Sequence, residues 1–223
     1  MIMEREQEIL ELLVREYIRT AEPVSSERVA SRMRRTLSSA SIRNIFSDLT
    51  DAGFIEQPHV SGGRVPKSRG YRFFVEKILE DESSASSMRS SGRDIDRIDG
   101  VEELQEMLAE SFHVLSACTG GPPIGFRELL REPEFNERGR VEELGTVLDG
   151  FREYEEAYAE ELRENPFEII IGDENEIHPI SHMTVMMTQI PDERTLFITG
   201  PTRMQYDRII HVMNIWQTKK KKK

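Results

Sequence analysis

The sequence lacks the features that mark secreted or membrane proteins. Cys118 is the only cysteine among 223 residues, and the apolar runs are only a few residues long. A single cysteine excludes an intramolecular disulfide framework and is typical of a reducing compartment. Short apolar runs cannot span a bilayer, and the acidic, helix-patterned N-terminus argues against a signal peptide. These absences predict a soluble cytoplasmic protein, and a length of 223 residues suits two small domains.

Positive charge is also scarce overall, because the formal net charge is −11. Its distribution is uneven, however. Residues 28–72 hold nine basic side chains against three acidic ones, which gives this window +6 and leaves −17 for the rest. The nine are Arg28, Arg32, Arg34, Arg35, Arg43, Arg64, Lys67, Arg69 and Arg72. Because phosphate binding depends on local charge, the window is a candidate nucleic-acid-binding region.

Three short helices are predicted before residue 53. Apolar residues at helical spacing indicate the first over residues 3–19. Ser25 and Ser38 are suitable N-caps for the second and third helices. Gly53 occupies the C′ position of the third helix, and the next residue can fold back as in a Schellman motif.

A hairpin is predicted after these helices. Residues 54–60 have the pattern of a strand, with Pro58 restricting it to a sheet edge. Residues 61–63 supply a tight turn, and a closing helix should reach about Glu80. Three helices followed by a two-stranded wing predict a winged helix-turn-helix domain over residues 1–80.

A second domain is expected after a serine-rich linker at residues 81–100. It should occupy residues 101–218 and end in a disordered lysine tail at 219–223. Helices are predicted over 101–115 and 141–164 and after 202, and strands over 167–171, 183–190 and 195–199. The predicted fold class is therefore α+β, with a small antiparallel sheet in the second domain.

The third helix is the candidate reading element. If its apolar face points inward, Ala40, Arg43, Asn44, Ser47 and Asp51 point outward. Arginine is suited to guanine, asparagine to adenine, and alanine to the methyl group of thymine. The alternative is that these residues only form a solvated helix face. The neighbouring helix, the wing and the charge asymmetry favour DNA contact.

Phosphate contacts are predicted at two places. The serines at the start of the third helix can hold a phosphate with the helix N-terminus. Basic residues on and behind the wing can contact the backbone or the minor groove, although they can equally be ordinary surface charges. The candidate DNA-contacting set is Ser38, Ser39, Ala40, Ser41, Arg43, Asn44, Ser47, Arg64, Lys67 and Arg69.

Other chemistry has little support in the sequence. His178 and His182 are four residues apart, but Pro179 argues against a helix that presents both to a metal. The glycines from Gly120 to Gly125 lack the Lys-Ser/Thr of a phosphate-binding loop, and Cys118 is expected to be a small buried thiol. No nucleophile with a base and an orienting group is apparent. The sequence predicts no enzyme, no metal and no cofactor.

Several motifs together carry a family resemblance. They are Pro23–Ser26, Leu37–Asn44, Glu56–His59, Gly63–Pro66, Gly70–Phe73, Pro133–Phe135, Ile171–Asn175 and Gly200–Tyr206. In these segments the chain resembles the HrcA-type heat-inducible transcription repressors. The resemblance implies a winged-helix N-terminus and a GAF-like C-terminal domain that dimerises. It also implies repression of heat-shock and chaperone operons through an inverted-repeat operator in double-stranded DNA, with a chaperonin as a further partner.

The chain also departs from the family pattern. Family members are longer, and the shortfall lies between Cys118 and Gly125, where they carry further strands and an inserted dimerising domain. The second domain is therefore expected to be a reduced GAF-like domain. Two other functions stay open from the residues: a winged helix that docks a protein, and a regulator that senses a small molecule through its second domain.

Overall fold

The computed structural model describes residues 2–33, 36–59, 62–80, 95, 98–178, 180–191 and 193–221. It divides into two compact units, Met1–Glu80 and Asp81–Lys223, and each is described by itself. Helices and antiparallel strands occur in both units, so the predicted α+β class is confirmed. Most of the predicted serine-rich linker, residues 81–94 with 96 and 97, lies outside the described residues.

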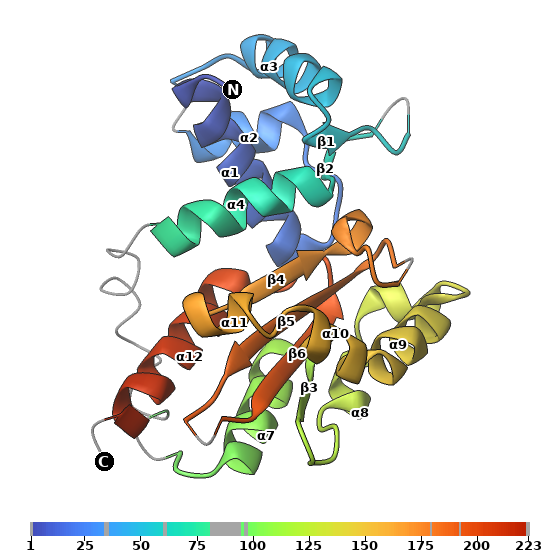
Figure 1. Ribbon diagram of the computed structural model, residues 1–223. Helices are drawn as coiled ribbons and strands as arrows, with labels where there is room; N and C mark the ends of the chain where they lie inside the picture. The colour runs from blue at the N-terminus through green and yellow to red at the C-terminus, as the bar shows by residue number, and fades with distance from the viewer. Residues whose placement is uncertain are drawn as a thin grey trace. The chain divides into compact units, whose positions relative to one another are not determined.

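The first unit contains three helices, a small hairpin and a closing helix (Figure 1). In chain order these are α1 (Glu4–Thr20), α2 (Ser26–Arg32), α3 (Ser39–Asp51), β1 (Ile55–Glu56), β2 (Val65–Pro66) and α4 (Ser68–Glu80). Helix α1 is central, since it contacts all three other helices and β2. Its residues Ile9, Leu10, Leu13 and Val14 are fully buried. The unit is therefore held together mainly by helix packing.

Side-chain caps begin α2 and α3 where the sequence predicts them. Ser25 Oγ accepts a hydrogen bond from the backbone N–H of Arg28 at 3.2 Å. Ser38 Oγ accepts one from the backbone N–H of Ser41 at 3.0 Å. Each cap satisfies an N–H group that has no partner inside its own helix.

The end of α3 also follows the prediction. Gly53 has φ of +77°, a conformation that favours glycine. The N–H of Gly53 donates to the carbonyl of Thr50 at 2.9 Å, and the N–H of Phe54 donates to that of Leu49 at 3.0 Å. This is the Schellman arrangement, and it directs the chain from α3 into the hairpin.

The hairpin strands are shorter than predicted. The sequence predicts a strand over residues 54–60, whereas β1 and β2 have two residues each and Ile55 faces Pro66. The ladder stops before Pro58, because proline has no N–H to donate. Residues 60 and 61, which belong to the predicted strand and turn, lie outside the described residues.

The second unit contains a four-stranded antiparallel sheet in the order β3-β6-β5-β4 (Figure 1). Its elements are α7 (Val101–Phe112), β3 (Leu115–Cys118), α8 (Phe126–Leu129), η1 (Pro133–Asn136), α9 (Arg140–Asp149), α10 (Phe151–Ala157), α11 (Glu161–Glu164), β4 (Glu168–Ile171), η2 (Gly172–Glu174), β5 (Met183–Gln189), β6 (Thr195–Pro201) and α12 (Tyr206–Lys221). The strands predicted in the last third of the chain correspond to β4, β5 and β6.

Helices pack on both faces of this sheet. On one face, Val185 and Phe197 join an apolar cluster with Leu144 and other residues of α9 to α11. On the other face, Thr184 Oγ1 lies 2.8 Å from the hydroxyl of Tyr206 at the start of α12. Alternating residues of β5 thus serve opposite layers, as the pleat requires. The predicted apolar stripe of α12 is buried.

The prediction of a helix over residues 101–115 is wrong at the C-terminal end. Helix α7 stops at Phe112, and His113 has a left-handed backbone with φ of 52°. The chain then enters β3, whose four residues are all buried. A short strand buried on both faces has no polar alternation, so periodicity does not separate it from the end of a buried helix.

The helix predicted over residues 141–164 is three helices, α9, α10 and α11. Gly150 separates the first two. A Cβ at Gly150 would lie 2.3 Å from Nε2 of His178, so a larger residue there would require the His178 ring to move. This contact joins residues 28 positions apart, which local pattern does not reveal.

The lysine tail is also shorter than predicted. Helix α12 continues to Lys221, and Lys219 Nζ lies 3.1 Å from a carboxylate oxygen of Asp99. Lys222 and Lys223 lie outside the described residues.

Candidate nucleic-acid interface

Helix α3 presents a polar face to solvent. Ile42, Phe46 and Leu49 point into the core of the first unit. The residues predicted to face outward are all exposed, namely Ala40, Arg43, Asn44, Ser47 and Asp51. The buried stripe fixes the rotation of the helix, and this rotation decides which side chains a partner meets.

The serines at the start of α3 are partly engaged with one another. Ser38 Oγ caps Ser41 and lies 2.9 Å from the hydroxyl oxygen of Ser41. Ser38 is exposed, whereas Ser39 and Ser41 are half-buried. Hydroxyl and backbone donors are therefore concentrated at this end of the helix.

Arg43 is held by the first two residues of α2. Its Nε donates to Ser26 Oγ at 3.2 Å, and its Nη2 donates to Glu27 Oε1. Ser26 is buried, whereas the side chains of Arg43 and Glu27 are 64% and 58% exposed. The pKa of Glu27 is lowered, first by a hydrogen bond from its own backbone N–H and then by Arg43. Sequence reasoning found Arg43 but missed both partners, which lie 16 and 17 residues earlier.

The return strand of the hairpin is anchored against the segment before α2. Val24 and Arg64 exchange two backbone hydrogen bonds, each of 2.8 Å. Gly63 lies so close to this segment that a Cβ would approach the carbonyl carbon and oxygen of Val24 to 2.6 Å. The hairpin is therefore held in a fixed place beside α2 and α3. Val24, Ser26, Arg43, Gln57, Arg64 and neighbouring residues line a surface cavity of about 370 Å³ between these elements.

The two other basic candidates of the hairpin region have different surroundings. Arg69 Nη1 donates to the carbonyl of Ala52 at 2.7 Å, and its guanidinium lies 4.4 Å from the ring centroid of Phe54. Arg69 thus joins the end of α3 to α4. Lys67 is exposed, and its backbone N–H donates to the carbonyl of Phe54 at 3.0 Å.

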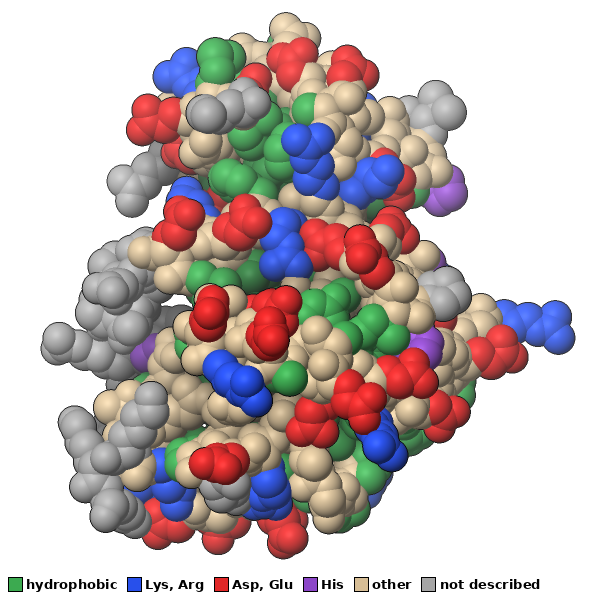
Figure 2. Space-filling model, in the orientation of Figure 1, with side chains coloured by type: hydrophobic (Ala, Val, Ile, Leu, Met, Phe, Trp, Pro, Cys, Tyr) green, Lys and Arg blue, Asp and Glu red, His purple; other side chains and the backbone are tan. Residues whose placement is uncertain are grey.

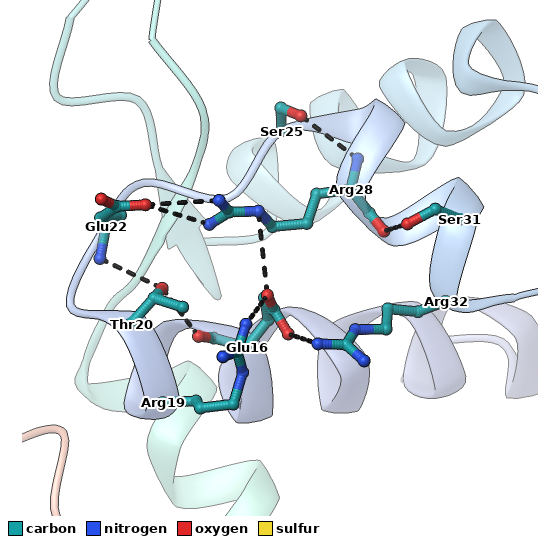
Figure 3. Close-up of polar contacts among 8 residues, drawn as sticks. All are labelled: Glu16, Arg19, Thr20, Glu22, Ser25, Arg28, Ser31 and Arg32. Carbon is teal, nitrogen blue, oxygen red and sulfur yellow. Dashed lines mark hydrogen bonds and ion pairs between the residues drawn. The ribbon is translucent and has the colours of Figure 1, made fainter.

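A buried carboxylate joins α1 to α2 (Figure 3). The side chain of Glu16 is only 7% exposed, and its oxygens lie 2.6 Å from Arg19 Nη2 and 3.0 Å from Arg32 Nη2. Arg28 Nε lies 3.8 Å away, and Arg28 also bonds Glu22 at 3.3 Å. The hydrogen bond from Arg19 lowers the pKa of Glu16, and burial opposes this. Sequence reasoning missed this cluster, because its members are spread over 17 residues.

These ion pairs change the interpretation of the basic window. Arg28, Arg32 and Arg43 are paired with Glu16, Glu22 and Glu27, all of which lie just before the window begins. Counted over Met1–Glu80, thirteen basic residues face twelve acidic ones, so the first unit carries +1 and the second −12. Acidic and basic side chains are interspersed on the visible face of the first unit (Figure 2). The net charge of +6 over residues 28–72 therefore overstates the positive charge of this region. Two further arginines of the window, Arg34 and Arg35, lie outside the described residues.

The weaker candidates occupy structural positions. His178 packs edge-on against Tyr154, and His182 lies 3.2 Å from a carboxylate oxygen of Glu143. Within the described residues, no three His, Cys, Asp or Glu side chains form a group that could hold a metal. Cys118 is buried, as predicted. Among the described residues, no helix is both long and apolar enough to cross a membrane.

Comparison with known proteins shows the family that this chain resembles. A family model described as the HrcA protein C terminal domain matches residues 76–210. The heat-inducible transcription repressor HrcA of Clostridium perfringens (strain SM101 / Type A) is 41% identical over 120 residues, which cover 53% of this chain and 35% of that protein. The repressor of the same name from Symbiobacterium thermophilum is 35% identical over 149 residues, covering 62% and 43%.

A solved structure shares the fold along the whole chain. A crystal structure described as that of a hypothetical protein, at 2.2 Å resolution, matches with a TM-score of 0.71 and covers 98% of this chain and 100% of that one. At 17% identity this similarity concerns the fold alone. The curated relatives are matched over less than half of their own length. Because the family model covers more than half of the residues, the chain belongs to the HrcA family.

Proposed function

We propose that this chain is a transcription repressor that binds double-stranded DNA through a winged helix-turn-helix in its first unit. One observation carries the proposal: α3 exposes Ala40, Arg43, Asn44 and Ser47 on a helix whose other face is locked into a core. An α-helix fits the major groove, where these side chain types match base edges.

The neighbouring elements suit this docking. Helix α2 lies against α3, as the first helix of a helix-turn-helix does. The hairpin lies beside both helices through the Val24–Arg64 pair, which is the position of a wing. In this arrangement Arg64 and exposed Lys67 contact phosphate, whereas Arg69 supports the end of α3. Ser38, Ser39 and Ser41 meet a phosphate at the start of α3.

The charge balance favours specific over non-specific binding. The first unit has a net charge of +1, and at least five of its arginines are paired with its own carboxylates, so few of its cations are left to attract any phosphate backbone. Affinity must then come from a small number of placed contacts. This property suits a protein that has to ignore most of the genome.

The names of the relatives supply the regulatory part of the proposal. HrcA proteins matched by this chain are named heat-inducible transcription repressors. We assign this chain to the same task in the cytoplasm: repression of heat-shock and chaperone operons through an inverted repeat, with a chaperonin as a partner. An inverted repeat requires a two-fold symmetric protein, so the second unit serves as a reduced GAF-like dimerisation domain. Solution mass tests the dimer directly.

Comparison of two variants tests the reading role of α3. Arg43→Ala should lower affinity for an inverted-repeat fragment from a chaperone promoter by about 1–3 kcal/mol and relax its sequence specificity. Lys67→Ala should weaken binding to operator and random duplexes alike and reduce the salt dependence. Gel shifts over a salt series measure both. Equal losses on operator and random DNA for Arg43→Ala would contradict base reading, and salt-independent binding would instead favour a protein-docking module.

A cavity in the second unit supports small-molecule sensing as a second candidate. It has a volume of about 480 Å³ and lies between the end of β3 and α10, with Cys118, Thr119, Phe151 and Glu155 in its lining. A mixture of apolar walls and a few polar groups is typical of ligand sites. A metabolite library screened by thermal shift tests this candidate, with Phe151→Ala as the variant that should abolish any shift.

A further inference from the structure

An exposed arginine is a poor reader of bases unless something orients it. Its side chain has several freely rotating bonds, and ordering them on binding opposes affinity. A partner that restricts these rotations before DNA arrives removes part of that penalty. In this protein Arg43 has such partners on the adjacent helix.

The two partners occupy one edge of the guanidinium. Nε and Nη2 lie on the same side of the group, and they donate to Ser26 Oγ and Glu27 Oε1 respectively. The adjacent edge, with one donor on Nη1 and the second hydrogen of Nη2, is not used by these two bonds. Two parallel donors of this kind match O6 and N7 of guanine.

The helix that carries both partners is packed in place. Ser26 is 5% exposed, and it follows Ser25, whose side chain caps α2. Ser26 and Glu27 are the first two residues of α2, so packing of α2 on α3 sets their distance from Arg43. This arrangement resembles the second-layer support that fixes functional side chains elsewhere in proteins.

We propose that Glu27 is a positioning residue that holds one edge of Arg43 so that its other edge reads a guanine. The proposal rests on the DNA-binding function proposed above. Glu27 then acts in two opposite directions. Its charge repels nearby phosphates and weakens binding to any duplex, whereas its hydrogen bond sharpens discrimination between duplexes.

The two opposite effects of Glu27, on affinity and on discrimination, provide the test. The full chain is first used to enrich duplexes from a random-sequence pool, and the enriched duplex is compared with a shuffled duplex of the same composition. Glu27→Ala should bind the shuffled duplex about two- to fivefold more tightly, because one acidic charge near phosphate is lost. Its preference for the enriched duplex should fall about five- to tenfold, a part of the discrimination that a bidentate arginine provides.

Two further variants separate orientation from charge. Glu22→Gln removes a carboxylate that is 67% exposed and pairs with Arg28 rather than Arg43, so it should strengthen shuffled-duplex binding and keep the preference. In an Arg43→Ala background, Glu27→Ala should cause no additional loss of preference, because the residue through which it acts is gone. Thermal unfolding checks that each variant is folded.

The outcomes distinguish the two proposals. If the wild-type protein shows no preference between the duplexes, the proposed function fails and this inference fails with it. The positioning role is overturned, and the DNA-binding function stands, if the wild type discriminates but Glu27→Ala keeps the full preference. The same holds if Glu27→Ala lowers the preference in the Arg43→Ala background as much as it does in the wild type.

Discussion

The two units of the chain are stabilised in different ways. The first has a sheet of two-residue strands, so it depends on helices packed around α1, on ion pairs between helices, and on close backbone contacts such as that of Gly63 with Val24. The second has strands of up to seven residues whose side chains form apolar layers on both faces. Local signals therefore describe the first unit well, whereas the second depends on pairing between distant segments.

The two units also differ in net charge. The first unit is nearly neutral, and carboxylates such as Glu16 and Glu27 hold arginines in place through ion pairs. The second unit carries −12, spread widely over its visible surface (Figure 2). On the proposed function, a few accurately placed cations would take the place of a large basic patch.

The largest effect should come from the apolar layer of the second unit. Phe197 is buried and stacks on Phe151 with ring centroids 4.4 Å apart. Phe197→Ala should lower the free energy of unfolding of this unit by about 3–5 kcal/mol. Fluorescence of Trp216, the single tryptophan, reports this unit alone. Hydrogen exchange over residues 4–80 should stay at the wild-type level. A matching loss of protection there would show that the units are not independent.

The next effect should be specific to the hairpin of the first unit. Gly63→Ala places a Cβ against backbone atoms of Val24, which no side-chain rotation relieves. We expect a loss of about 2 kcal/mol in the stability of the first unit and faster hydrogen exchange at Val24 and Arg64. DNA binding should weaken, because the wing is displaced. Unchanged exchange at both positions would contradict the close approach.

A smaller effect should follow from the buried carboxylate. Glu16→Gln leaves three arginines without their shared counter-charge, and since these arginines are partly exposed, we expect a loss of about 1–2 kcal/mol at neutral pH. The pKa of Glu16 is lowered from 4.5, so its stabilisation is complete above pH 4.5 and disappears as the pH falls through the lowered pKa.

The free energy of unfolding of Glu16→Gln should therefore fall less than that of the wild type as the pH is lowered below 4.5. Denaturant titration at several pH values measures this difference. Glu8→Gln, which changes an exposed carboxylate on the same helix, serves as the control. If stability depended on pH equally in the wild type and in Glu16→Gln, ionised Glu16 would not stabilise the first unit.

The smallest effect should be a gain in stability. Gly145 lies inside α9, and a Cβ there would meet no atom within 4 Å. Gly145→Ala should raise the stability of the second unit by about 0.5–1 kcal/mol, because alanine loses less backbone entropy in a helix. Thermal unfolding followed by Trp216 measures it. A loss of stability instead would mean that this part of α9 is not regular helix.

Several features could be predicted because their causes lie within a few residues. The caps at Ser25 and Ser38 and the Schellman turn at Gly53 follow from side-chain and backbone geometry over three to five positions. The exposed face of α3 follows from apolar spacing along one helix. For the same reason, the residue types suited to base contact could be named in advance.

Other features were decided only by the tertiary structure. Three contacts join residues from different elements: the pairing of Arg43 with Glu27, the burial of Glu16 among arginines, and the close approach of Gly150 to His178. The strand at residues 115–118 exists because β6 pairs with it about 80 residues later. The sequence by itself thus determined the caps of α2 and α3, the end of α3 and its exposed face, since these depend on short-range geometry. Ionic partners, strand pairing and the net charge around the exposed face of α3 required the packed chain, because only folding brings those residues within reach of one another.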